Sequence, residues 1–97
     1  MNKRYIAGRA AEYRAKKELE KEGWVVLRAS GSHGVFDLAA AHPTYSKTRW
    51  IQIKTCKNNS MSRMREDFLG HPPLMGSFDR SQELWVWHCG TWYKSVT

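Results

Sequence analysis

The sequence predicts an α/β fold, with a central mixed β-sheet flanked by helices. Residues 3–22 are rich in Ala, Glu, Lys, Arg and Leu, which all favour helices, so a long helix comes first. Short apolar, β-branched runs separated by turn residues follow, and such runs are typical of strands. A second segment with helical spacing lies between these runs, which predicts the order α-β-β-β-α-β-β.

Local signals set where each element begins and ends. Gly23 stands where a helix C-cap belongs, so the first helix ends there. The expected strands cover residues 24–27, 35–41, 49–55, 83–88 and 91–96. The last two pair as a hairpin around Cys89-Gly90. Helical spacing predicts a short helix from Met61, Met64, Phe68 and Leu69, and this helix ends before Gly70, Pro72, Pro73 and Gly76.

The composition fits one folded domain over residues 1–97. Of its 97 residues, 41% are hydrophobic and five are Trp, which excludes a disordered chain. No run approaches the roughly 18 apolar residues that span a bilayer, and the first residues lack the apolar core of a signal peptide. We therefore expect a cytoplasmic protein, of a size that would suit a phage or mobile element acting in its host cell.

The charge and the cysteine content limit which partners and metal sites are expected. The net charge of +7 favours polyanions, although a merely soluble basic protein has the same composition. Cys56 and Cys89 form no CxxC pair, and the four His show no zinc-ligand spacing. We expect free thiols and no structural zinc, because lone cysteines inside a cell stay reduced.

Glu12 is the one carboxylate on the stripe of the first helix that is expected to face the sheet. At about 100° per residue, this stripe contains Tyr5, Gly8, Glu12, Ala15 and Leu19. Burial of an unpaired carboxylate is costly, so a cation or hydrogen-bond donors should lie beside it, and a metal ion would supply the cation. Alternatively, Glu12 lies at the edge of the stripe and pairs with Lys16, in the favourable i, i+4 orientation.

Asp37 interrupts an otherwise apolar predicted strand, where Asp is disfavoured. Gln52 and Lys54 project from one face of the next predicted strand, so the three side chains converge if these strands pair. Carboxylate and amide oxygens suit Mg²⁺, which can polarise a phosphate and activate water. Lys54 can stabilise charge growing on that phosphate. Alternatively, Asp37 and Lys54 form a salt bridge and Gln52 is merely solvated.

The loop over residues 28–34 joins the first two predicted strands and suits phosphate contacts. Its small residues let the backbone approach closely, and Ser30 and Ser32 can donate to phosphate oxygens. Arg28 can act as a phosphate clamp. Such Ser-Gly loops are also ordinary turns, and His33 reads as a solvated loop residue.

Together these segments resemble the archaeal-type Holliday junction resolvases, within the restriction-endonuclease-like PD-(D/E)xK nucleases. The matching segments are residues 8–12, 21–28, 30–38 and 51–54, in the family's order and spacing. The resemblance implies an active site of Glu12, Asp37, Gln52, Lys54 and Ser32. Glu12, Asp37 and Gln52 would hold Mg²⁺, with Mn²⁺ as a substitute, and Ser30, Ser32 and Arg28 would touch phosphates near the cut.

The resemblance also implies an endonuclease of DNA recombination and repair. It would act as a homodimer that nicks opposed strands of a four-way junction symmetrically and leaves ligatable ends. Three departures weigh against it: Gln52 stands where the family usually has Glu, Tyr13 stands where Arg is common, and the chain from Lys57 onward matches poorly. A missing carboxylate should weaken metal affinity.

Two further surfaces are expected to bind partners. Aromatic residues are enriched at interface centres, so Trp85, Trp87, Trp92 and Tyr93, together with residues 61–69, predict the dimer interface, with core packing as the alternative. Basic residues that flank the site in sequence would neutralise DNA phosphates, or are solvated charges: Lys3, Arg4, Arg9, Arg14, Lys47, Lys57, Arg63 and Arg65.

Other functions stay open. A nicking nuclease of the same fold could act on other DNA structures. A catalytically silent junction-binding dimer would explain Gln52 as a mark of lost metal affinity. An RNA-binding module has only the charge in its favour.

Overall fold

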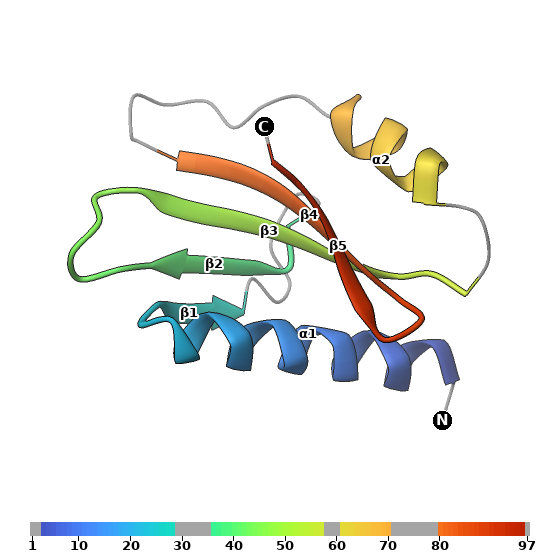
Figure 1. Cartoon of the computed structure of the whole chain (residues 1–97), viewed down its shortest axis with the longest axis horizontal. Helices are drawn as coiled ribbons and strands as arrows, with labels where there is room; N and C mark the ends of the chain where they lie inside the picture. The colour runs from blue at the N-terminus through green and yellow to red at the C-terminus, as the bar shows by residue number, and fades with distance from the viewer. Residues whose placement is uncertain (1–2, 29–35, 58–60, 71–79, 97) are drawn as a thin grey trace.

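A five-stranded sheet with one helix against each face makes up the described part of the chain in the computed structural model (Figure 1). The structure describes residues 3–28, 36–57, 61–70 and 80–96, and the side chains from residue 7 onward. The elements are α1 (Lys3–Lys21), β1 (Val25–Arg28), β2 (Leu38–Ala41), β3 (Thr48–Thr55), α2 (Met61–Leu69), β4 (Arg80–His88) and β5 (Thr91–Val96). The predicted α/β class, with its central mixed sheet flanked by helices, is confirmed.

The strands lie in the order of the sequence, β1-β2-β3-β4-β5. Neighbouring strands are antiparallel except for β3 and β4, which run parallel in the register Ile51↔Glu83 and Ile53↔Trp85. A parallel pair needs a crossover connection, and α2 lies within this one. The single parallel pair is what makes the sheet mixed.

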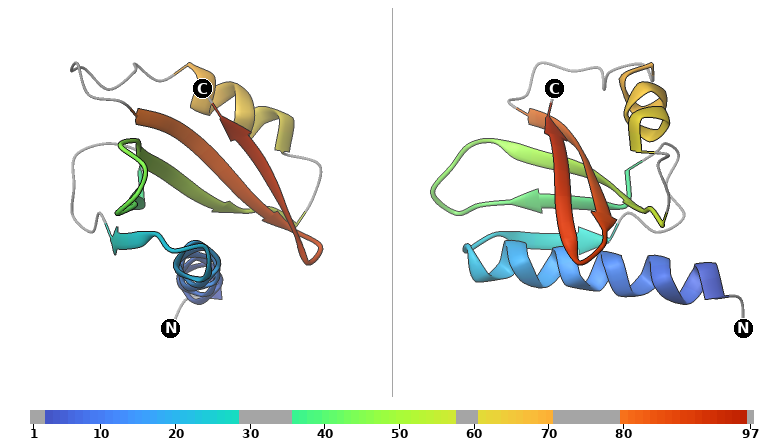
Figure 2. Two further views of the ribbon diagram at one scale, coloured as in Figure 1. Left: turned by 60° about the vertical axis from the view of Figure 1, so that its left-hand side comes forward. Right: turned by 45° about the vertical axis from the view of Figure 1, so that its right-hand side comes forward.

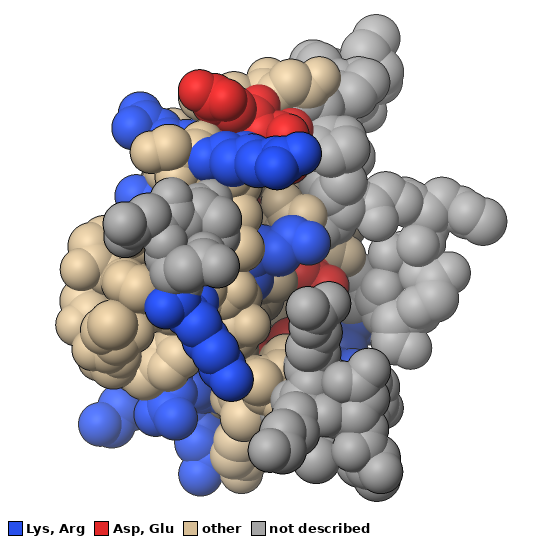
Figure 3. All heavy atoms as spheres, turned by 90° about the vertical axis from the view of Figure 1, so that its right-hand side faces the viewer, with Lys and Arg blue, Asp and Glu red and all other residues tan. Residues whose placement is uncertain are grey.

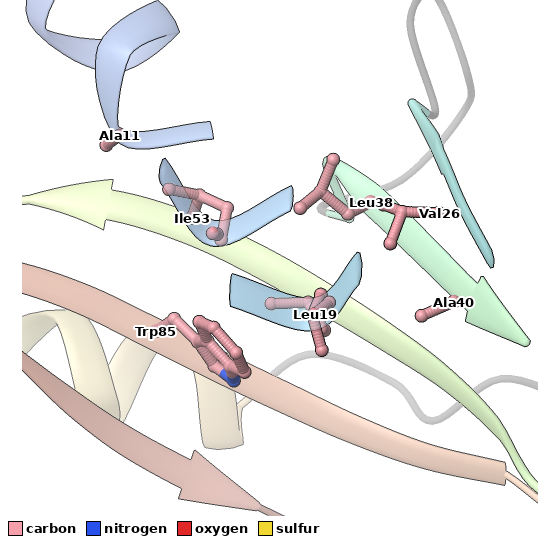
Figure 4. Close-up of a cluster of buried hydrophobic side chains, with 9 residues drawn as sticks. Ala11, Leu19, Val26, Leu38, Ala40, Ile53 and Trp85 are labelled. Carbon is pink, nitrogen blue, oxygen red and sulfur yellow. The ribbon is translucent and has the colours of Figure 1, made fainter. Parts of the chain in front are cut away.

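Two apolar clusters fill the two sides of the sheet. On one side, Ala11, Ala15 and Leu19 of α1 pack on side chains of the sheet that include Leu38, Ile53 and Trp85 (Figure 4). On the other side, a smaller cluster joins α2 to the sheet through Cys56, Phe68, Leu84 and Val86. Alternation along β3 therefore sends Ile51 and Ile53 towards α1, and Gln52 and Lys54 to the opposite face.

The ends of α1 and of the β4–β5 hairpin have the backbone geometry that the sequence predicts. Gly23 has a φ of 94°, and Gly23 N and Trp24 N donate to Glu20 O and Leu19 O at 3.0 and 3.1 Å, which closes the helix with a Schellman motif. Cys89 and Gly90 both have positive φ, as a two-residue type I′ hairpin turn requires. Both features are local, so local sequence signals were enough to predict them.

Several predicted boundaries are corrected. The second strand begins at Leu38 rather than Val35, so Asp37 lies just before β2 and not inside it. β1 begins at Val25, because the Trp24 amide belongs to the helix cap, and β4 begins three residues before the predicted Glu83. The buried stripe of α1 is centred on Ala11, Ala15 and Leu19, which leaves Glu12 at its edge.

Packing within the chain accounts for most of the aromatic residues of the β4–β5 hairpin. Trp85 is 1% exposed in the core, and Trp87 and Trp92 pack against the same cluster. Tyr93 is about half exposed, as is Leu69 on α2. Neither described helix is long and apolar enough to cross a membrane.

Candidate functional site

Asp37 is fixed at the end of the sheet by two hydrogen bonds to β3. Its backbone amide donates to Ile51 O at 2.9 Å, and its Oδ2 accepts a bond from the Ile53 amide at 2.7 Å. The preceding Phe36 is held by edge contacts with Trp50 and Phe68, at ring distances of 6.2 and 6.4 Å. The expected pairing of the Asp37 and Gln52 segments is confirmed, and the carboxylate has a defined position beside β3.

Burial and several charged side chains act on the pKa of Asp37. Burial raises this pKa above its ordinary value of 3.8, and the negative charge of Glu12 raises it further. The Ile53 amide, Lys54 and Arg28 act in the opposite direction. The charges of Glu12, Lys54 and Arg28 therefore all act on the Asp37 carboxylate.

Glu12 approaches this centre from α1. Its Oε2 lies 3.0 Å from Arg28 Nη2, and its side chain is 21% exposed. This Oε2 atom is itself shielded from solvent, and no described donor hydrogen-bonds it, so the contact with Arg28 is an ion pair without hydrogen-bond alignment. The alternative pairing with Lys16 is wrong, because Lys16 pairs with Glu20 at 3.8 Å.

Gln52 and Lys54 approach Asp37 from the face of β3 that is turned away from α1. Gln52 is half-buried and Lys54 is exposed. Asp37 lies where β1 ends and β2 begins, next to the Leu38↔Ile51 pair. Figure 3 views the molecule from this end and shows acidic atoms recessed among Lys and Arg side chains. The alternative of a simple Asp37–Lys54 salt bridge is not seen, because no oxygen of Asp37 lies within ion-pair distance of Lys54 in the described part of the chain.

The predicted DNA-binding residues divide into three groups. Arg9 and Arg28 line, with Glu12, Tyr13 and Lys16, a cavity of about 100 Å³. Other predicted residues lie elsewhere: Lys57 is exposed just beyond β3, Arg63 and Arg65 are exposed on α2, and Lys47 lies in the β2–β3 connection at the far end of β2 from Asp37. Ser30, Ser32 and the side chain of Arg4 lie outside the described residues.

The chemistry of the donor set fits a hard divalent ion. Glu12 and Asp37 offer carboxylate oxygens and Gln52 an amide oxygen, which are ligands that Mg²⁺ accepts. The shielded Glu12 Oε2 accepts no hydrogen bond from a described donor, so beside its ion pair with Arg28 it keeps an acceptor that a metal ion could use. Among the described residues no three His, Cys, Asp or Glu side chains are close enough to form a metal site, so a bound ion would need the Gln52 oxygen, backbone carbonyls or water as further ligands.

Sequence reasoning missed a second buried carboxylate, Glu83. Arg49 donates to both of its oxygens at 2.7 and 2.8 Å, and Ser81 and Trp85 donate at 2.7 and 2.9 Å. Burial alone would raise the pKa of Glu83, but these hydrogen bonds outweigh it and the pKa is lowered. Because four donors occupy the carboxylate, Glu83 ties β3 to β4. The available signal was that Glu83 lies two residues before Trp85, on the same face of a strand, and next to the apolar run 84–87.

One end of the sheet thus brings together two carboxylates, an amide, an ammonium group and guanidinium groups. These groups can bind a divalent ion and a phosphate at one place. The function must be inferred from this arrangement of side chains, since no protein-family model matches the chain and no curated protein is significantly similar to it in sequence.

Proposed function

We propose that this protein is a metal-dependent endodeoxyribonuclease that resolves four-way DNA junctions as a homodimer. The observation that carries the proposal is the shielded Glu12 Oε2, which no described donor hydrogen-bonds, on a side chain whose charge also acts on Asp37. The charge of Glu12 opposes ionisation of Asp37, and a cation bound at both carboxylates would remove this repulsion. A nuclease of this kind acts inside the cell, where its substrate is.

The side chains have separate roles in phosphodiester hydrolysis. Glu12, Asp37 and Gln52 would hold Mg²⁺ or Mn²⁺, which supplies charge stabilisation at the phosphate and acidifies a water molecule. Lys54, exposed beside Asp37, stabilises the negative charge that grows on the phosphate as water attacks phosphorus and the bond to the leaving oxygen breaks. Asp37 keeps its orientation through the Ile53 amide.

The basic groups beside Glu12 suit the DNA backbone. Arg9, Arg28 and Lys16 share a cavity of about 100 Å³ with Glu12 and Tyr13, which is enough for one phosphate group. The net charge of +7 attracts DNA, so affinity should fall steeply with salt. Ser30 and Ser32 belong to the proposed phosphate contacts on the strength of the sequence resemblance alone.

Junction selectivity follows from two copies of the site. One site cuts one strand, and paired symmetric nicks need a second site related by a two-fold axis. Recognition by shape fits a fold in which the described helices show no arrangement for base reading. A protein of the same fold that has one active site, or two active sites at a different distance from each other, would nick other DNA structures.

Gln52 favours one competing function, a junction-binding dimer without catalysis. An amide in place of a carboxylate lowers the charge available to the metal ion. Cleavage of a four-way junction in Mg²⁺ and in Mn²⁺, with linear duplex and flap DNA as comparisons, separates the candidates. Junction nicking by the wild type, with binding but no nicking by Asp37→Ala, supports the resolvase. Junction binding without nicking in either metal identifies the silent dimer, and preferred nicking of flaps identifies the other nuclease.

A further inference from the structure

A second basic surface lies on the flank of α1 that faces away from the candidate site. The β4–β5 hairpin reaches along this flank, whereas β1 lies on the other side of the helix (Figure 2, left). Between α1 and the hairpin is a cavity of about 790 Å³, lined by Arg14, Lys17, Glu18, Glu20, Lys21, Trp87 and Trp92. Glu12 and Arg28 do not line it.

The cavity carries a positive charge that its own acids do not cancel. Glu18 accepts a hydrogen bond from Lys94 at 3.4 Å, and Glu20 pairs with Lys16 at 3.8 Å. Both acids are therefore matched by lysines that do not line the cavity. Lys17 lies 4.9 Å from the centre of the Tyr13 ring, a contact that does not neutralise its charge, so Arg14, Lys17 and Lys21 can attract an anionic ligand.

Flat groups lie between these cations. The Trp87 and Trp92 rings are half-buried, with centroids 4.9 Å apart and planes inclined by 65°. The guanidinium carbon of Arg14 lies 4.2 Å from the centre of the Trp87 ring, which is a cation–π contact. Aromatic and guanidinium planes accept nucleobases on their faces, and neighbouring lysines accept phosphates.

We propose that this groove binds a segment of single-stranded DNA, with bases on Trp92 and on the Arg14–Trp87 pair and phosphates against Lys17 and Lys21. Bases in a duplex are stacked on one another, so a stacking groove takes a strand that is unpaired, as at an opened branch point. The proposal deepens the proposed function and rests on it for the identity of the strand as DNA. The binding itself needs neither Glu12 nor Asp37.

Fluorescence anisotropy in EDTA tests the groove without cleavage. The probes are a labelled oligothymidylate of about 12 nucleotides, an abasic oligomer of equal length and a duplex of equal length. Stacking predicts that the oligothymidylate binds about tenfold or more tightly than the abasic oligomer, and that Trp92→Leu removes this preference. Equal affinity for the two single-stranded oligomers would mean that charge attraction alone causes binding, and this would overturn the proposal. A preference for the duplex would also overturn it.

Variants of exposed lysines test the proposal without the risk that replacement of Trp92 disturbs the β4–β5 hairpin. Lys17 and Lys21 are exposed, and Lys17→Ala with Lys21→Ala should lower the slope of log affinity against log salt by about 1.4, the share of two phosphates of a single strand. Lys47→Ala, at the far end of β2 and outside the lining of the cavity, is the control for charge alone and should leave this salt slope unchanged. An equal effect of Lys47→Ala and the groove variants contradicts the proposal. Junction cleavage by the same wild-type sample reports separately on the proposed function.

Discussion

The carboxylate of Asp37 accepts a 2.7 Å hydrogen bond from the backbone amide of Ile53, which ties the candidate site to the middle strand of the sheet. This bond crosses from the residue before β2 to a strand that is buried on one face against α1. It stabilises the ionised form of Asp37, while burial and Glu12 oppose ionisation more strongly. The site therefore holds a carboxylate in place under conditions that favour a bound cation.

Replacement of the neighbouring charges should shift the pKa of Asp37 in opposite directions. Glu12→Gln removes a charge that raises this pKa and should lower it, whereas Arg28→Gln removes a charge that lowers it and should raise it. Carboxyl-carbon NMR titration of the metal-free protein measures both. Glu66→Gln, on the exposed surface of α2, is the control. Shifts in the same direction, or no shift, would show that these side chains do not share a site in solution.

Asp37→Asn should stabilise the metal-free protein at neutral pH. The folded-state pKa of Asp37 is raised, so the ionised form favours unfolding and stability falls as the pH rises through that pKa. The Asn side chain has the same shape and can still accept the hydrogen bond from the Ile53 amide. It removes the cost of ionising a half-buried carboxylate, so the free energy of unfolding should rise by up to about 1 kcal/mol. Urea unfolding in EDTA at pH 7 measures the gain, which should vanish at a pH where Asp37 is protonated. A loss of stability at pH 7 would contradict this account.

Gln52→Glu should strengthen metal binding. A third carboxylate beside Glu12 and Asp37 adds negative charge to the ligand set, and the Mg²⁺ concentration at half-maximal junction cleavage should fall by about tenfold. Gln82→Glu places the same charge on the neighbouring strand β4, opposite Trp50, and serves as the control. If both variants shift the midpoint equally, the effect comes from general charge and Gln52 is not a ligand.

Glu83 should support stability and not catalysis. Its side chain is 3% exposed, and Glu83→Gln leaves Arg49 without its counter-charge, at a cost of about 3 kcal/mol in urea unfolding at pH 7. Because the folded-state pKa of Glu83 is lowered, its contribution is present above its ordinary value of 4.5 and is lost as the pH falls through the lowered value. The difference between variant and wild type should therefore shrink in acid. A variant of full stability that no longer cleaves junctions would place Glu83 in the active site instead.

The parts of the fold that depend on local sequence signals agree with their predictions. The cap at Gly23, the turn at Cys89-Gly90 and the alternation along β3 each depend on a few neighbouring residues. In the stripe predicted for α1, Ala15 and Leu19 are buried as expected, but Ala11 is buried in place of Glu12, which lies only 100° from it around the helix. The network of Glu83 could not be predicted, since its partner Arg49 is chosen by the parallel register of two strands joined by a long crossover.

The members of the candidate site stay a prediction, whereas the structure adds the geometry of its strands. The resemblance implied Glu12, Asp37, Gln52 and Lys54 from their order and spacing. It did not predict that Glu12 and Lys54 reach Asp37 from opposite faces of the sheet, or that Asp37 stands before its strand and not within it. These features depend on how the ends of β1 and β2 meet β3, which is a property of the assembled sheet.

Paramagnetic broadening of backbone amide signals by Mn²⁺ tests most directly whether one ion binds between Glu12 and Asp37. At low Mn²⁺, the account predicts that the amide signals of Ile53, Leu38 and Glu12 broaden first, and those of Lys47 and Thr48 at the other end of the sheet broaden last. Asp37→Asn should abolish this order. Broadening that begins elsewhere in the protein, or that is the same in Asp37→Asn, would contradict a metal site at this end of the sheet.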